Sequence, residues 1–289
     1  MYKTAIVTDT NSGLLPEEAE HLGIHLVPMP VIVDEESFFE YVSITQADFF
    51  ARLKGGAAVS TSQPSPGALL SCWDALLETY DNLVYIPMSS SLSGEYQTAA
   101  MLAEDYDGRV HVADTHRISV TQRQAALDAL HWVQQEKSAA EIKVYLEHDG
   151  RNSNIFIAVN TLELLKKSGR VTAAGAALGS ILSIKPVLRI QGGKLDAYRK
   201  VRGMRAAIQA MIEGLQADLQ QLDCPQVMLR AAYAGDCAAG IAWQAALQEA
   251  FPECTVGLDP LPLSVCCHVG YGALGVGIAK DILTEGDAI

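Results

Sequence analysis

Short apolar runs alternate with helical patterns along the first half of the chain, and this alternation limits the possible folds most. Buried strands are predicted at "TAIVTD" (4–9), "NLVYIPM" (82–88) and "RVHVADT" (109–115), and helical patterns lie between and after them. Strands that alternate with helices form a parallel sheet with helices on its faces. Residues 1–150 are therefore predicted to form an α/β domain built from βαβ units.

Capping residues set the expected ends of several helices in this half. Pro16 suits a first helical position and Gly23 a helix stop, and Ser65-Pro66 is a typical N-cap followed by proline. "SAAE" at 138–141 is a capping box. The run "IHLVPMPVIV" (24–33) is predicted as a strand that its two prolines bend or place at an edge.

The second half follows a different pattern. "NIFIAV" (154–159) predicts a strand, residues 161–170 and 173–184 predict helices, and residues 185–201 predict a hairpin that turns at Gly192-Gly193. A helix over 203–222, a strand over 226–234 and a helix over 237–251 follow. Residues 151–289 are therefore predicted as a mixed α+β domain, with the boundary near "HDGRNSN" (148–154).

Composition and charge exclude several classes of protein. The chain has 289 residues, of which 49% are hydrophobic and 19% charged, so it can bury a large core. Its formal net charge of −13 argues against nucleic acid as a partner, because nucleic-acid-binding surfaces are basic. We find neither a signal peptide nor an apolar run of about 18 residues that could span a membrane. The six cysteines show no C-x-x-C spacing, so we expect free thiols, no metal site and a cytoplasmic location.

Three loops in the first half are rich in hydroxyl and amide side chains: "TDTNSG" (8–13), "STSQPS" (60–65) and "SSSLSG" (89–94). Each is placed at a predicted junction between a strand and the helix that follows it. Ligands of open α/β sheets bind at the carboxyl ends of strands, where free N–H groups favour anions. Hydroxyls add donors without charge, which suits a carboxylate. The alternative is that these residues serve only as helix caps and turns.

Seven segments, taken together and in order, resemble the DegV family: "TSQPSPG" (61–67), "SSSLSG" with "YQTA" (89–99), "VADT" (112–115), "LELLKKSGRV" (162–171), "LSIKPVLRIQGGKL" (182–195), "KVRG" (200–203) and "HVGYGALGVG" (268–277). The resemblance covers nearly the whole chain. It implies a two-domain α/β fold that holds one long-chain fatty acid, such as palmitate, between the domains. It also implies that the protein is a carrier rather than an enzyme, and that a separate ATP-dependent fatty acid kinase makes an acyl phosphate from the bound acid.

The resemblance also assigns a ligand-binding set of six residues: Thr61, Ser62, Ser93, Gly94, Arg170 and His268. The hydroxyls of the T-S-Q-P-S and S-L-S-G motifs would hold the carboxylate, and His268 of the H-x-G-x-G motif would lie near it. Arg170 would lie near the headgroup and contact the phosphate during transfer. The family often has Gly-Gly-Arg where this chain has Ser168-Gly169-Arg170, so the loop that carries Arg170 departs from the family pattern.

Burial of an acyl chain would supply most of the affinity. Each methylene contributes about 0.8 kcal/mol, so sixteen carbons supply on the order of 10 kcal/mol before the costs of binding. The small residues of "AAGAALGS" (173–180) leave room for such a chain, or else allow close helix packing. No cofactor is expected besides the bound acid.

Other functions remain open from the sequence. A serine-type acyl hydrolase would use Ser93 and His268, with Asp114 completing a triad, although the chain has no G-x-S-x-G elbow. A sugar or polyol binder of related fold is a third alternative.

Basic residues cluster between 185 and 205. They predict either a solvated hairpin, a docking surface for an acidic partner, or a site of transient contact with an anionic membrane surface. The cluster consists of Lys185, Arg189, Lys194, Arg199, Lys200, Arg202 and Arg205.

Overall fold

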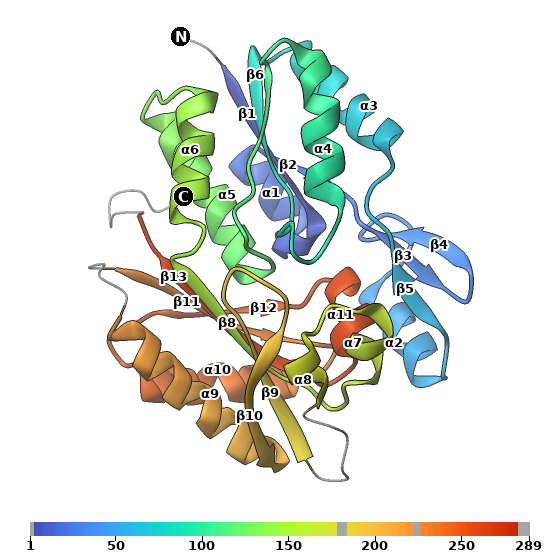
Figure 1. Cartoon of the computed structure of the whole chain (residues 1–289), viewed down its shortest axis with the longest axis vertical. Coiled ribbons are helices and arrows are strands. Elements are labelled where there is room, and N and C mark those ends of the chain that lie inside the picture. The colour runs from blue at the N-terminus through green and yellow to red at the C-terminus, as the bar shows by residue number, and fades with distance from the viewer. Residues whose placement is uncertain (1–2, 178–183, 222–225, 283–289) are drawn as a thin grey trace.

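The computed structural model describes residues 3–177, 184–221 and 226–282, and it contains a parallel sheet in its upper part (Figure 1). This four-stranded sheet has the order β2-β1-β6-β7, and all its neighbouring strands are parallel. Its strands are β1 (Thr4–Asp9), β2 (Ile24–Val27), β6 (Asn82–Ile86) and β7 (Val110–Val112). The predicted parallel sheet of the first half is therefore confirmed.

Helices cover both faces of the parallel sheet, and each face has its own apolar cluster. Side chains of α1, α5 and α6 pack on one face around Ile6 and Val84, and those of α3 and α4 pack on the other around Val7 and Tyr85. These helices are α1 (Pro16–Leu22), α3 (Pro66–Leu77), α4 (Glu95–Ala103), α5 (Val120–Gln134) and α6 (Ala139–Asp149).

The expected caps form. Ser65 accepts a hydrogen bond from the Ala68 N–H and Pro66 occupies the first helical position of α3. Ser138 and Glu141 make the reciprocal bonds of a capping box at the start of α6. Gly23 ends α1 with a φ of 72°, a left-handed conformation that glycine adopts at little cost.

A mixed six-stranded sheet occupies the lower part of the molecule in Figure 1, with the order β10-β9-β8-β13-β11-β12. Only β11 and β12 are parallel within it. Helices α9 (Gly203–Leu219) and α10 (Cys237–Ala250) cover one of its faces. The strands are β8 (Ser153–Ala158), β9 (Ile184–Ile190), β10 (Asp196–Arg202), β11 (Val227–Tyr233), β12 (Val256–Pro260) and β13 (Leu274–Lys280).

The opposite face of the six-stranded sheet packs against two short helices and against residues of the first half, including Ile118 and Leu92. These helices are α7 (Glu163–Ser168) and α11 (Leu263–Val269), and the short helix α8 (Ala173–Ala177) lies against β10. The predicted helix over 173–184 is confirmed over Ala173–Ala177. Residues 178–183 lie outside the described residues, and Ile184 already belongs to β9.

A third, three-stranded sheet corrects the expectation for residues 24–33. The two prolines divide this run into β2, which joins the parallel sheet, and β3 (Pro30–Val33), which joins a separate antiparallel sheet. Its other strands are β4 (Glu36–Phe39) and β5 (Val59–Thr61), with α2 (Gln46–Lys54) between them in the chain. The hydroxyl segment at 60–65 therefore begins within β5, a strand of this small sheet, rather than after a strand of the parallel sheet.

The link between α6 and β8 separates the two large sheets in the sequence. We retain the division into residues 1–150 and 151–289 as a proposal, because α6 ends at Asp149 and β8 begins at Ser153.

Within residues 3–177, 184–221 and 226–282, no helix combines the length and the apolar character needed to cross a membrane.

Candidate ligand-binding site

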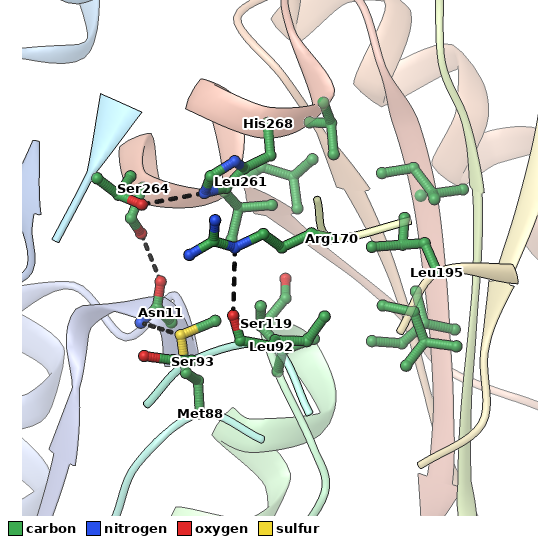
Figure 2. A pocket seen from close by; sticks show the side chains of 18 of the residues that line it. Asn11, Met88, Leu92, Ser93, Ser119, Arg170, Leu195, Leu261, Ser264 and His268 are labelled. Atoms are coloured by element: carbon green, nitrogen blue, oxygen red, sulfur yellow. Dashed lines mark hydrogen bonds between the residues drawn. The ribbon is translucent and has the colours of Figure 1, made fainter. Parts of the chain in front are cut away.

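A cavity lies between the parallel sheet and the face of the six-stranded sheet that α9 and α10 leave uncovered. Its empty volume, counted with its open mouth, is about 850 Å³. Polar side chains gather at one end of it, and Leu195 lies at the other (Figure 2). The cavity therefore offers one polar end and one apolar end.

Strands of the six-stranded sheet form much of the apolar wall. Ile155 and Ile157 project from β8 and Ile190 from β9, since alternate residues of a strand share a face. In the ladder, Ile157 is paired with Gly275 of β13, and Gly275 is paired with Ala232 of β11. Gly275 and Ala232 are small and lie side by side on neighbouring strands, so they leave space for a ligand on this face of the sheet.

The polar end draws on segments that are far apart in the sequence. It combines the loop after β1, the end of β5 with the loop after it, the serine loop after β6, the start of α5, the loop after α7, and α11. Its polar residues are Asn11, Thr61, Ser62, Gln63, Ser93, Ser119, Arg170, Ser264 and His268.

His268 is held in place by Thr61. The Thr61 Oγ1 atom lies 3.1 Å from His268 Nε2, and His268 Nδ1 is buried without a hydrogen-bond partner among the described residues. Burial, and secondarily the nearby Arg170 guanidinium, lower the pKa of His268 to about 4. His268 is therefore neutral near pH 7 and can donate one hydrogen bond and accept another.

Arg170 extends from the end of α7 toward the polar end of the cavity (Figure 2). Its Nε atom donates to the Leu92 carbonyl at 3.3 Å, and its Nη1 atom donates to the Ser168 carbonyl. Gly169 ends α7 in the left-handed conformation, and the Ser168 hydroxyl donates to the Leu165 carbonyl. The departure from the family pattern at Ser168 thus leaves Arg170 at the cavity.

The serine loop after β6 brings Ser93 to the same end. The Ser93 Oγ atom accepts a hydrogen bond from the Glu95 N–H at 3.2 Å, and no acceptor for the Ser93 hydroxyl proton is found among the described residues. That proton is available to a ligand. A buried hydroxyl or N–H that faces a cavity favours a ligand with an acceptor oxygen, because an unsatisfied polar group costs free energy.

The other two assigned residues lie less directly on the cavity. Ser62 lines it, but its hydroxyl donates to the Gln63 carbonyl at 3.0 Å. Gly94 lines a neighbouring hollow instead, and a Cβ atom at that position would lie 3.1 Å from Gln63 Oε1. Four of the six assigned residues, namely Thr61, Ser93, Arg170 and His268, therefore present functional groups at the polar end.

Sequence reasoning missed Ser264 and Glu40. The Ser264 hydroxyl donates to Asn11 Oδ1 at 2.5 Å, and Asn11 Nδ2 donates to Met88 Sδ at 3.3 Å. Glu40 accepts hydrogen bonds from the Leu263 N–H at 2.5 Å and from the Thr10 hydroxyl at 2.9 Å. Glu40 thereby fixes the start of α11, the helix that carries Ser264 and His268.

Two buried carboxyl groups, those of Asp9 and Glu40, hold segments that line the polar end of the cavity. Asp9 accepts from the Asn11 N–H at 2.7 Å and from the Met88 N–H at 2.8 Å, and it is fully buried. Burial raises the pKa of Asp9 to about 6 and that of Glu40 to about 7. Both groups titrate near neutral pH and orient segments that line the cavity.

A change at Glu40 is expected to alter the pH dependence of stability. The pKa of Glu40 in the folded protein lies above its ordinary value of 4.5, so the folded state keeps the proton more tightly than the unfolded state. The wild type should therefore lose stability as the pH rises from about 4.5 to about 7, with a Glu40 contribution of about 3 kcal/mol. Glu40→Gln should remove this part of the slope.

The measurement is the free energy of unfolding in denaturant at pH 5 and at pH 8. Asp9 and His268 titrate in both proteins, so the difference between wild type and variant reports Glu40 together with its coupling to Asp9. Equal pH dependence in the two proteins would show that Glu40 stays ionised in the fold.

The structure does not assemble the triad considered from the sequence. Asp114 accepts hydrogen bonds from the Ser90 and His116 N–H groups, both at 3.2 Å. A triad requires a carboxylate on the second ring nitrogen of the histidine, and His268 Nδ1 has no partner in the described part of the chain. Ser93, His268 and Asp114 therefore do not form a catalytic triad in the described part of the chain.

About half of the basic cluster between 185 and 205 is engaged within the fold. Lys185 donates a hydrogen bond to Asn160, and Lys194 donates one to the Gly169 carbonyl. Arg189 forms an ion pair with Asp218, and Arg199 forms one with Glu213.

The described residues contain no group of three or more His, Cys, Asp or Glu side chains placed to hold a metal ion.

Comparison with known proteins gives consistent matches over nearly the whole chain. Residues 3–281 match the family model described as an uncharacterised protein, DegV family. A DegV domain-containing protein of Deinococcus radiodurans is 31% identical over 275 residues, which cover 95% of this chain and 97% of the relative.

Solved structures agree with this result. The structure titled as fatty acid binding of a DegV family protein from Thermus thermophilus has a TM-score of 0.87 and 28% identity, and the match covers 96% of this chain and 99% of that one. DegV from Bacillus subtilis, described as a fatty acid binding protein, has a TM-score of 0.86 and 25% identity, with 97% and 100% covered.

Proposed function

Because the chain belongs to the DegV family, we propose that it binds one long-chain fatty acid and presents it to a separate ATP-dependent kinase, which forms an acyl phosphate. The observation that carries the proposal is a single cavity whose polar end continues into an apolar wall. The related proteins of Thermus thermophilus and Bacillus subtilis, described as fatty acid binding, support the same ligand class. The protein is then a lipid carrier rather than an enzyme.

The carboxylate would lie at the polar end of the cavity. Ser93 has a free hydroxyl proton there, Thr61 is oriented by neutral His268, and Arg170 supplies a positive charge. Charge-assisted hydrogen bonds to a carboxylate are about twice as strong as neutral ones. These contacts offset the loss of water around the carboxylate and fix the direction of the ligand.

The acyl chain would lie along the apolar wall, beside Ile155, Ile157 and Ile190. No further cofactor is needed for this role. A carrier of this kind would work in the cytoplasm, between a membrane that supplies the acid and the kinase that uses it. Basic side chains of the 185–205 segment that remain exposed, such as Lys200 and Arg205, would contact an acidic partner or, transiently, an anionic membrane surface.

Native mass spectrometry of the protein purified from a bacterium tests the carrier against the hydrolase. We expect one bound fatty acid per chain, released intact on denaturation. Turnover of a palmitoyl ester that Ser93→Ala abolishes would favour the acyl hydrolase instead. A mass equal to that of the chain alone, both as purified and after incubation with palmitate, would contradict fatty acid binding.

Loss of the Ser93 hydroxyl should weaken palmitate binding. Ser93→Ala leaves the carboxylate short of one donor, so we expect a loss of about 1–3 kcal/mol in binding free energy, measured by calorimetric titration of delipidated protein. Ser65→Ala is the matched control, because it removes a helix cap at a residue that does not line the cavity. That control should lower stability by about 1 kcal/mol and leave the affinity unchanged. Equal affinities of wild type and Ser93→Ala would remove Ser93 from the site.

A further inference from the structure

A second hollow lies beside the polar end of the cavity. Its empty volume, counted with open solvent, is about 710 Å³. Three segments meet around it: the serine loop with the first turn of α4, the end of α7, and the β9–β10 hairpin. Its lining consists of Ser90, Ser91, Leu92, Ser93, Gly94, Gln97, Ser168, Gly169, Arg170 and Lys194.

This hollow, here called the Lys194 subsite, adjoins the main cavity. Leu92, Ser93 and Arg170 line both spaces. A carboxyl group held by Ser93 and Arg170 would therefore lie at the boundary between them. One oxygen of this carboxyl group would face the main cavity, and the other would face the Lys194 subsite.

The lining of the Lys194 subsite suits an anion. It contains two cations, Arg170 and Lys194, and the hydroxyls of four serines, but no carboxylate. Lys194 Nζ donates to the Gly169 carbonyl at 3.2 Å, which holds the ammonium group at the rim. The carboxylate of Asp114 accepts from the Ser90 N–H but does not belong to the lining.

Some donors in this lining are still available. Arg170 uses Nε and Nη1 for backbone carbonyls, and no partner for its Nη2 atom is found among the described residues. Lys194 makes one of the three hydrogen bonds that an ammonium group can donate. A doubly charged group with three acceptor oxygens matches these donors better than a second carboxylate does.

We propose that the Lys194 subsite binds the phosphoryl group of an acyl phosphate while the acyl chain stays in the main cavity. This inference rests on the proposed function, since the acyl phosphate is the product that the kinase would form on the carried acid. Lys194 and Ser90 then recognise the product and not the free acid, because neither residue lines the main cavity.

The test compares two ligands on the same variants. The probes are palmitate and a stable phosphonate analogue of palmitoyl phosphate, in which a methylene replaces the bridging oxygen. Lys194→Gln should weaken binding of the phosphonate by about 5- to 10-fold and change palmitate affinity by less than about twofold. Lys167→Gln removes an exposed lysine of α7 that lies outside both linings, and it should change neither affinity.

Ser90→Ala is a second, smaller test, with a phosphonate-specific loss of about threefold expected. Phosphonate affinity that neither variant changes, in a protein that binds palmitate, would overturn the subsite. An equal loss for both ligands would also overturn it, because it would assign Lys194 a structural role. Failure of the wild type to bind palmitate would refute the proposed function itself, and the subsite with it.

Discussion

Octanoate is expected to bind between about four and five orders of magnitude more weakly than palmitate. The two acids share the carboxylate and differ by eight methylenes, each of which contributes about 0.8 kcal/mol when it leaves water. Apolar residues of β8, β9 and β13 line the cavity, which has its polar end on one side and Leu195 on the other (Figure 2). The measurement is displacement of a fluorescent fatty acid, at ligand concentrations below those at which palmitate aggregates.

Hexadecanol provides the control for the headgroup. It keeps the chain but lacks the charge, so it should bind more weakly than palmitate by less than the octanoate difference. Affinity that is independent of chain length would mean that the polar end alone recognises the ligand, and it would rule out the apolar wall as the source of affinity.

A large side chain at Gly275 should block the cavity. Gly275 pairs with Ile157 and with Ala232, both of which line the cavity, so its side chain would point to the same face. Gly275→Phe would then occupy the space of several methylenes and lower palmitate affinity by about 100-fold or more. The measurement is calorimetric titration with palmitate, together with the free energy of unfolding.

Gly275→Ala is the matched control. A Cβ atom at this position would lie 3.5 Å from the Phe156 carbonyl oxygen and 3.7 Å from Ile157 Cγ1, which are ordinary contacts. The alanine variant should therefore fold and bind palmitate nearly as the wild type does. If Gly275→Phe folds and retains wild-type affinity, the acyl chain does not pass this row of the sheet.

The sequence was sufficient to predict elements whose causes are local. The strands β1, β6 and β7, the caps at Ser65 and Ser138 and the β9–β10 hairpin depend on neighbouring residues, and each of these was confirmed. The parallel pairing joins residues as distant as Thr4 and Asn82, and it was predicted from the alternation of strands and helices. The three-stranded sheet was missed because nothing local shows that Pro28 and Pro30 divide a run between two sheets. The family resemblance supplied four side chains that meet at the polar end, and local patterns alone would have offered only the hydroxyl loops.

The supporting contacts of the site could not be read from the sequence. Glu40 and Leu263 are 223 residues apart, and Asn11 and Ser264 are 253 residues apart. Glu40 stands within an acidic segment, "DEESFFE", where a solvated carboxylate is the ordinary expectation. Only the tertiary fold buries it against the start of α11.

A crystal structure of the protein with palmitate tests the central claim most directly. We expect the carboxylate within about 3 Å of the Ser93 hydroxyl and close to Thr61 and Arg170, with the chain running beside Ile157 toward Leu195. Palmitate with its carboxylate at the Leu195 end, or bound outside a cavity that side chains have filled, would contradict the account.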